Sequence, residues 1–348
     1  MNNTSGGHLE TWAVTAGRTD DHNALAPVLW ASTAYTTDTV DQGRQLAAGP
    51  GAARFYSRYG NPTVRNFEEA VAALEGAPTA RAFASGMGAI SAVVLGLCGK
   101  GSHIVAQNRM YAGTTLLLQT VCPRFGIDVT FVDATVPGAL TAAVRPGETM
   151  LVLTETPANP RLDIVDLDEL GAIEGPFTVV DSTFATPLGQ QPLTHGVDLV
   201  VHSATKAMAG HNDATLGVVA GATDLLDWLW SFAVLQGANA SPNDALNGLH
   251  ELAARQMKVT GGLLTIDLHG GLEAGTRFVE GTRLALLATS PGGPETLVTH
   301  PASTTHVGLD PDQLDAAGIG PGAVRISVGL EHPDDLAADF LQALAGQS

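Results

Sequence analysis

Five short apolar runs, separated by stretches with helical patterning, follow one another between residues 103 and 203 of this 348-residue chain. The runs are HIVAQ (103–107), DVTFVD (128–133), TMLVLTE (149–155), FTVVD (177–181) and VDLVVHS (197–203). Nearly continuous apolar runs of this length are typical of strands that are buried on both faces. Their alternation with helical segments predicts an α/β fold, in which a mainly parallel sheet carries helices on both faces.

The pattern changes after Val218, where a Trp-rich helix is expected near residues 224–235 and a short one near 245–257. Beyond these, LLTIDLH (263–269) and AVRISVG (323–329) look like strands, and helices are expected near 274–282 and from Asp334. This mixture predicts an α+β second domain. The expected limits are 51–257 for the large domain and 258–348 for a C-terminal domain.

The composition excludes two classes of partner. The chain has 35 acidic and 17 basic residues, a formal net charge of −18, so nucleic acid and anionic membrane surfaces would be repelled. Its longest apolar stretch, near residues 87–99, is too short to span a bilayer. No signal peptide is visible, which predicts a cytoplasmic protein in which Cys98 and Cys122 are free thiols.

Lysine is rare in this chain and occurs only at Lys100, Lys206 and Lys258. Arginine replaces lysine as a charge but cannot act as an amine nucleophile, so a reactive amine must be one of these three. Lys100 and Lys258 lie in turn-like junctions, where a solvated charge is the ordinary expectation. Lys206 follows the apolar run 197–201, at the carboxyl end of a predicted strand, where α/β sheets bind ligands.

Four loop segments carry residue types that a pyridine cofactor with a phosphate group would need. Gly86–Gly88 opens a helix, whose N-terminus favours a phosphate, and Asp181 ends a buried strand, where it could keep a pyridine nitrogen protonated. Ser203–Lys206 supplies hydroxyls and an amine, and Tyr56–Thr63 supplies a phenol and a guanidinium. Each segment alone is common, because most such residues are caps or turn residues. Their occurrence together favours a cofactor site.

Eight motifs resemble the Cys/Met-metabolism (trans-sulfuration) family of pyridoxal 5'-phosphate (PLP) enzymes, which includes cystathionine γ-synthase and γ-lyase, methionine γ-lyase and O-acylhomoserine sulfhydrylases. They are YSRYGNPT (56–63), SGMGAIS (85–91), MYAGTT (110–115), TETPANP (154–160), VDSTFATP (180–187), HSATKAMAGHND (202–213), SPGGPETLVTHPASTTH (290–306) and VRISVGLE (324–331). The resemblance implies PLP fold type I, which is the aspartate-aminotransferase-like fold. It also implies a homodimer or homotetramer whose active sites are shared between subunits, with residues 1–50 as an arm on the neighbouring subunit.

The resemblance also implies a role for each matching residue. Lys206 would hold PLP as an internal aldimine, Asp181 would pair with the ring nitrogen, and Tyr111 would stack on the ring. The phosphate would be bound by Gly86, Met87, Ser203 and Thr205, and by Tyr56 and Arg58 of the neighbouring subunit. Asn159 would contact the ring hydroxyl, Glu155 would lie near the cofactor, and Arg325 and Ser290, with Tyr56, would bind the substrate.

The activity implied is a PLP-dependent lyase that eliminates a γ- (or β-) substituent from an amino acid. It would proceed through an external aldimine and a vinylglycine-type intermediate, with Tyr111 as a general acid. The alternative is a γ-replacement transferase of the cystathionine γ-synthase or O-acylhomoserine sulfhydrylase type. A hypothesis of another class is a non-catalytic partner subunit. No histidine spacing matches a zinc pattern, so no metal is expected.

Three departures from the family pattern bear on specificity. Thr289 stands where members that handle cystathionine have Glu, and Gly113 stands where many methionine γ-lyases have Cys. The segment 248–257 also runs almost directly into the strand-like 259–268, so a block of the C-terminal domain seen in the family is missing here. We therefore expect a reduced C-terminal domain and an altered substrate pocket.

Overall fold

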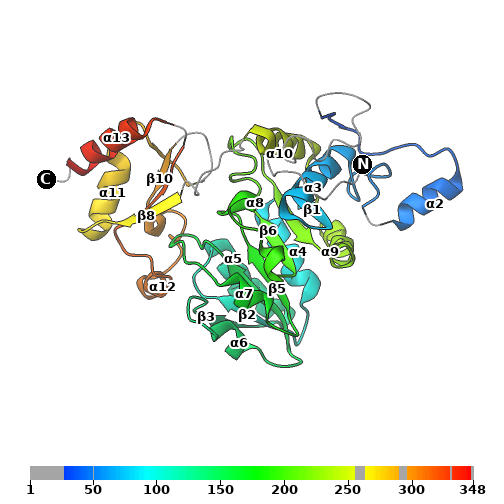
Figure 1. Ribbon diagram of the computed structural model, residues 1–348, viewed down its shortest axis with the longest axis horizontal. Coiled ribbons are helices and arrows are strands. Elements are labelled where there is room, and N and C mark those ends of the chain that lie inside the picture. Colours follow the sequence, from blue (N-terminus) through cyan, green and yellow to red (C-terminus); the bar gives the residue numbers. More distant parts are fainter. Residues whose placement is uncertain (1–26, 50, 255–262, 290–295, 330, 346–348) are drawn as a thin grey trace.

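The computed structural model describes residues 27–49, 51–254, 263–289, 296–329 and 331–345. Its strands form a seven-stranded sheet in the order β1-β7-β6-β5-β4-β2-β3 and a four-stranded sheet in the order β8-β11-β10-β9, set side by side (Figure 1). The large sheet comprises β1 (Thr79–Phe83), β2 (His103–Gln107), β3 (Asp128–Val132), β4 (Thr149–Glu155), β5 (Phe177–Asp181), β6 (Leu199–His202) and β7 (Gly217–Gly221). Its helices are α3 (Pro62–Glu75), α4 (Gly86–Leu97), α5 (Ala112–Leu116), α6 (Ala139–Ala143), α7 (Leu167–Gly171), α8 (Thr186–Gly189), α9 (Thr223–Gln236) and α10 (Pro242–Ala254).

The five predicted strands are β2 to β6, and each pairs in parallel with its neighbours among them. The expectation of a mainly parallel sheet is therefore confirmed. β1 and β7 were not predicted; β7 runs antiparallel to both β6 and β1. Both are fully or nearly buried strands rich in Ala and Gly. They lack the bulky apolar run by which the other strands are recognised.

Helices cover both faces of the large sheet. α4 and α9 lie on one face, where Leu153, Val179 and Val201 belong to one apolar cluster with Ile90 and Val93 of α4. α3 and α6 lie on the other face. Since both faces are covered, the strand ends are the only edge at which a ligand could approach the parallel strands.

The N-terminal segment binds to the start of α3 and then leaves the domain. The Trp30 backbone N–H donates to Thr63 Oγ1 at 2.8 Å, and Asn61, the N-cap of α3, donates through Nδ2 to the Trp30 carbonyl at 2.8 Å. α2 (Val40–Ala48) has no buried residue and lies away from the sheet (Figure 1). A helix that buries no residue against the described part of its own chain fits the predicted arm on a second subunit, which stays a prediction.

The C-terminal domain is a small α+β layer. It contains β8 (Leu263–Asp267), α11 (Gly271–Gly281), β9 (Leu286–Leu287), β10 (Leu297–Thr299), α12 (Pro311–Ala316), β11 (Ala323–Ser327) and α13 (Pro333–Ala345). β11 is a central strand, antiparallel to β8 and β10. Phe278 packs with Val298, Val324 and Ile326 in the core of this domain. The expected boundary near residue 257 lies outside the described residues, so the domain limits stay a prediction.

Candidate active site

A pocket of about 290 Å³ is lined by residues at the carboxyl ends of the parallel strands and by Arg325 of strand β11. Ten of the residues singled out in the sequence line it. They are Gly86, Met87, Tyr111, Glu155, Asn159, Asp181, Ser203, Thr205, Lys206 and Arg325. These residues are spread over 240 positions of sequence. The parallel topology brings those of the large domain to one edge of its sheet, and β11 of the C-terminal domain adds Arg325.

The N-terminus of α4 forms one wall. Ser85 caps the helix by accepting the Gly88 N–H at 3.0 Å, which points the first N–H groups of the helix towards the pocket. A Cβ at Gly86 would lie 2.6 Å from the Ser203 Cβ and 2.8 Å from its Oγ. The absent side chain therefore keeps open a cradle between a helix N-terminus and a serine hydroxyl, which suits a phosphate group.

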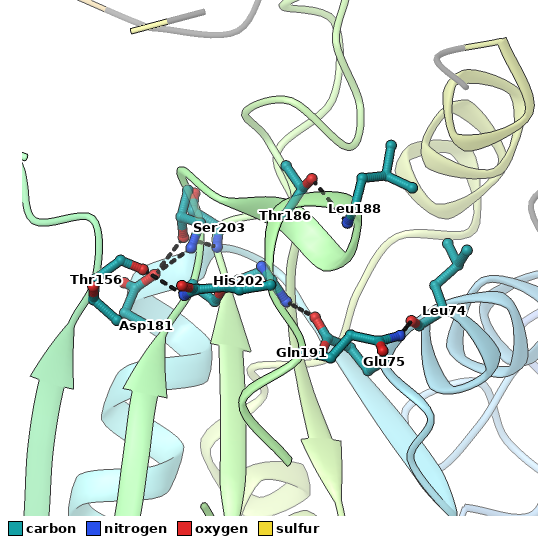
Figure 2. A network of polar contacts seen from close by, with 12 residues as sticks. Leu74, Glu75, Thr156, Asp181, Thr186, Leu188, Gln191, His202 and Ser203 are labelled. Atoms are coloured by element: carbon teal, nitrogen blue, oxygen red, sulfur yellow. Dashed lines mark hydrogen bonds and ion pairs between the residues drawn. The ribbon is translucent and has the colours of Figure 1, made fainter. Parts of the chain in front are cut away.

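Asp181 is held at one oxygen. Thr183 donates to Asp181 Oδ1 through its backbone N–H at 3.0 Å and through its hydroxyl, and it accepts the Ser203 N–H at 2.8 Å. Figure 2 shows Asp181, His202 and Ser203 at adjoining strand ends. Because both bonds from Thr183 fall on Oδ1, the second oxygen can face a ligand. Burial raises the pKa of Asp181, while the bonds from Thr183 and the charge of His202 lower it.

Glu155 lies directly opposite Asp181 across strands β4 and β5. Burial raises the pKa of Glu155 well above its usual range, and the neighbouring Asp181 carboxylate raises it further. Two carboxylates buried at paired positions of neighbouring strands repel each other when both are ionised. A cationic group between them, such as a protonated pyridine, would stabilise the ionised pair.

The pocket also contains two basic side chains, Lys206 and Arg325. Burial lowers the pKa of Lys206 to about 8, and the nearby guanidinium of Arg325 adds to the shift. Burial likewise lowers the pKa of Arg325 to about 10. The lowered pKa gives Lys206 a sizeable neutral fraction near neutral pH, which is the state an amine nucleophile needs.

Arg325 is 3 % exposed and is oriented from two sides. Its Nη1 donates to Asn159 Oδ1 at 3.2 Å and its Nη2 donates to the Thr289 carbonyl at 2.7 Å. The planar guanidinium is thereby held by Asn159 of the large domain and by the backbone of Thr289, in the loop before residue 290. A guanidinium held in this way can bind a carboxylate through its remaining N–H groups.

Tyr111 is the N-cap residue of α5, and its side chain is 38 % exposed at the mouth of the pocket. Its ring lies over Gly113, where a Cβ would come within 2.5 Å of the ring Cε1 and 3.2 Å of the Met87 sulfur. The glycine that replaces the cysteine of many methionine γ-lyases therefore gives the Tyr111 ring the space that it occupies.

Comparison with known proteins agrees with this arrangement. The family model for Cys/Met metabolism PLP-dependent enzymes matches residues 10–249 and 247–345. The chain belongs to this family. It is 36 % identical to an O-succinylhomoserine sulfhydrylase of Pseudomonas aeruginosa, over 98 % of this chain and 96 % of the relative, and 36 % identical to an L-methionine gamma-lyase of Fusobacterium nucleatum, over 97 % and 98 %. The crystal structure of a cystathionine gamma synthase from Xanthomonas oryzae superposes with a TM-score of 0.89 at 33 % identity, covering 98 % of both chains.

As a Cys/Met metabolism enzyme, the protein uses PLP and catalyses γ-elimination or γ-replacement on an amino acid, and its fold is PLP fold type I. The hypothesis of a non-catalytic partner subunit is set aside. The pocket fits PLP on its own evidence, because the Gly86 cradle suits the phosphate, Asp181 has an oxygen that Thr183 does not bind and that could pair with a ring nitrogen, and the Lys206 amine has a lowered pKa. When bound, PLP supplies an electron sink for a carbanion at Cα.

The match to the sulfhydrylase extends over 387 aligned positions, 39 more than the 348 residues of this chain, so the relative has residues without a counterpart here. The two matches of the family model meet at residues 247–249, within α10. That the missing residues belong to the C-terminal domain stays a prediction.

Not every predicted site residue lies in this pocket. Tyr56 and Arg58 line a separate hollow of about 500 Å³ with Ser32, Asn239 and Ser241. If the active site is shared between subunits, Tyr56 and Arg58 must lie away from the pocket of their own chain. Ser290 lies outside the described residues.

The predicted bond between the Thr205 hydroxyl and the phosphate competes with hydrogen bonds that this hydroxyl already makes. The Thr205 hydroxyl donates to the Leu216 carbonyl at 3.1 Å and accepts the Leu216 N–H at 2.8 Å. It would have to turn its O–H away from Leu216 to bind a phosphate, whereas Ser203 and the α4 N–H groups need no such change.

The described residues contain no group of three or more metal-ligating side chains, and both cysteines are buried and free. No helix in the described part of the chain is long and apolar enough to cross a membrane.

Sequence reasoning missed several residues. Thr183, Phe184 and Thr305 line the pocket, and each lies inside a quoted motif. Thr183 and Phe184 follow the predicted Asp181 by two and three residues. It also missed the fully buried pair of Glu75 and His202, whose Oε1 and Nε2 lie 2.5 Å apart (Figure 2). That pair joins the end of α3 to the end of β6, immediately before Ser203.

Proposed function

We propose that this enzyme eliminates an uncharged γ-substituent from an amino acid, releasing ammonia and an α-keto acid with consumption of one water. The observation that carries the proposal is the distribution of charge in the pocket. Among the described residues, the charged side chains that line it are Glu155, Asp181, Lys206 and Arg325. All four face the positions of the cofactor, the amine or the substrate carboxylate, so none remains for a charge at the distal end of a substrate.

The remaining walls are uncharged. They include Met87, Ile90, Phe184, Thr289 and Thr305. Thr289 stands at the position where cystathionine-handling members have Glu, so the described pocket offers no carboxylate for a distal amino group. Desolvating such an ammonium without a partner would weaken binding. This supports a small thioether, thiol or neutral acyl group as the substituent.

Within this proposal each residue has a defined task. Arg325 binds the α-carboxylate through the N–H groups that Asn159 and Thr289 leave available, and so orients Cα towards Lys206. The Lys206 Nζ takes the proton from Cα, and a second proton leaves Cβ before the bond from Cγ to the substituent breaks. The Tyr111 hydroxyl, at the mouth of the pocket, donates a proton to the leaving group.

We also propose that the site is completed by a second copy of the chain. Tyr56 and Arg58 lie in the hollow bordered by Ser32 and Ser241, with α2, which has no buried residue, nearby in sequence, and neither lines the active-site pocket of its own chain. In a homodimer related by two-fold symmetry each chain would offer this pair to the other. A homotetramer and a cytoplasmic location stay predictions.

The test is a substrate series with purified holoenzyme. Methionine, homocysteine and O-acetylhomoserine have uncharged γ-substituents, whereas cystathionine and O-succinylhomoserine carry a distal charge. We expect ammonia and a keto acid from the first group, with kcat/KM for the second at least about tenfold lower. Equal rates for cystathionine and methionine would refute the proposal.

γ-Replacement is the second candidate, and the sulfhydrylase relative favours it. Repeating the O-acetylhomoserine reaction with an added thiol separates the two. A thioether product that replaces the keto acid would make the enzyme a transferase, whereas unchanged ammonia release without thiol incorporation supports the lyase.

A further inference from the structure

Glu155 ends strand β4 inside the pocket and has no task in the chemistry described above. The residue is 6 % exposed, and its backbone N–H donates to Gln107 Oε1 at 2.9 Å, which aligns it with the end of β2. A carboxylate buried opposite another carboxylate is costly, so its bonds must offset that cost.

Both oxygens of Glu155 accept backbone N–H groups from residues of the site. Oε2 accepts the Tyr111 N–H at 2.6 Å, and Oε1 accepts the Asn159 N–H at 2.6 Å. Asn159 in turn accepts Arg325 Nη1 at 3.2 Å. One carboxylate thus joins the loop after β2, the loop after β4 and the central strand of the C-terminal domain.

We infer that Glu155 is a positioning residue that fixes the cofactor-stacking ring of Tyr111 and the carboxylate-binding guanidinium of Arg325 in one frame. The inference rests on the roles proposed for those two residues. Two short bonds to backbone N–H groups leave the loops little freedom to shift, and bonds of this charge-assisted kind are the stronger ones in proteins. Burial and Asp181 both raise the pKa of Glu155, so these N–H groups also stabilise the ionised form against its surroundings.

Glutamine cannot replace Glu155 in this task. Its amide has the same shape but one oxygen, so one of the two N–H groups would face an NH₂ group instead of an acceptor. Aspartate keeps both oxygens but is one methylene shorter, so it cannot reach both N–H groups at their present positions. Glu155→Gln and Glu155→Asp therefore perturb the frame in two independent ways.

A matched control is available at Glu68. This glutamate is also buried, accepts a backbone N–H (that of Ala82, at 2.9 Å) and has a pKa raised by burial, but it lies outside the active-site pocket. Glu68→Gln makes the same chemical change and is expected to lower only the thermal midpoint.

The experiment compares the holoenzymes of wild type, Glu155→Gln, Glu155→Asp and Glu68→Gln. The readouts are the visible circular dichroism of bound PLP, which reports how the ring is held, and separate kcat and KM values for the best substrate. We expect both Glu155 variants to weaken the dichroism and to raise KM about tenfold, the effect of losing one hydrogen bond to a charged group. Glu68→Gln should leave both readouts at the wild-type value.

The outcomes are distinguishable. Glu155 variants that match Glu68→Gln in dichroism and KM would overturn the inference and leave the proposed function intact. If wild type converts no γ-substituted amino acid, the proposed function fails, but the dichroism of bound PLP still tests Glu155. If Glu155→Gln does not fold, Glu155→Asp decides by the same two readouts.

Discussion

The lowered pKa of Lys206 makes a quantitative prediction about how the apoenzyme takes up PLP. Burial and the Arg325 charge bring the pKa of this amine from 10.5 to about 8. At pH 7 the neutral fraction is then about 9 %, against about 0.03 % for an ordinary lysine, a gain of about 300-fold. Only the neutral amine attacks the PLP aldehyde, so the attachment rate should follow this fraction.

The assay mixes apoenzyme with PLP and follows the change in visible absorbance from about pH 6.5 to 10.5, a range that brackets both pKa values. We expect the rate of attachment to rise about tenfold per pH unit and to level off near pH 8. Lys206→Ala should show no attachment. Lys100→Ala should match the wild type, because Lys100 is exposed and distant in the fold from the pocket residues.

Two variants of Arg325 test the cause of the shift. Arg325→Gln removes the positive charge, so the levelling point should move to higher pH, whereas Arg325→Lys keeps a charge and should move it less. A wild-type rate that continues to rise beyond pH 10 would refute the reasoning. So would a levelling point that Arg325→Gln moves to lower pH.

Three further predictions concern the cradle, the shared site and the small domain. Gly86→Ala places a Cβ 2.6 Å from the Ser203 Cβ, so the PLP affinity of the apoenzyme, measured by titration, should fall at least tenfold, about 1.4 kcal/mol. Gly99→Ala, whose Cβ meets nothing within 4 Å, should leave the PLP affinity unchanged. Arg58→Ala and Lys206→Ala, each inactive alone, should recover about one quarter of wild-type activity when co-expressed, because half of randomly formed dimers contain one intact site; no recovery would argue against sharing. Phe278→Ala should lower the free energy of unfolding by about 3–5 kcal/mol in a denaturant titration, since this ring is 1 % exposed in the C-terminal core; a loss below about 1 kcal/mol would contradict that packing.

The fold was predictable where the signal is local. Asn61 and Pro62 begin α3 and Gly76 ends it in a left-handed conformation (φ +66°), as their residue types indicate. The helical segment after β2 is less regular, since α5 ends at Leu116 and a π-helical turn follows at Leu117–Val121. The hydrogen bonds of a π-helical turn span one residue more than those of an α-helix, and the spacing of apolar residues in the sequence does not predict this difference.

Strand β7 shows why the rest of the sheet could not be predicted. A Cβ at Gly217 would lie 2.1 Å from the Ser85 carbonyl oxygen, so the first residue of this strand must be glycine to let the chain pass the start of α4. Glycine lowers strand propensity, and the neighbour that requires it lies more than 130 positions earlier. The requirement is tertiary, and no local pattern carries it.

The same distinction applies to the site. The identities of Lys206, Asp181 and Arg325 could be inferred from strand ends and motifs, because the chemistry restricts the residue type. The partners that orient them could not. Thr183 holds Asp181, and Asn159 holds Arg325 across 166 positions, through bonds that many other residue types could make.

Arg325 also explains how a shortened C-terminal domain can serve the same chemistry. It lies on β11, which is flanked by β8 and β10, so its backbone is fixed by bonds on both sides. Its side chain is then bonded to Asn159 of the large domain. We expect the missing positions to lie where 248–257 runs into 259–268, before β8 and so outside this central strand. A deletion there would shorten the C-terminal domain but leave the Arg325 guanidinium in its position. We therefore expect the deletion to change which γ-substituents fit rather than how the α-carboxylate is bound.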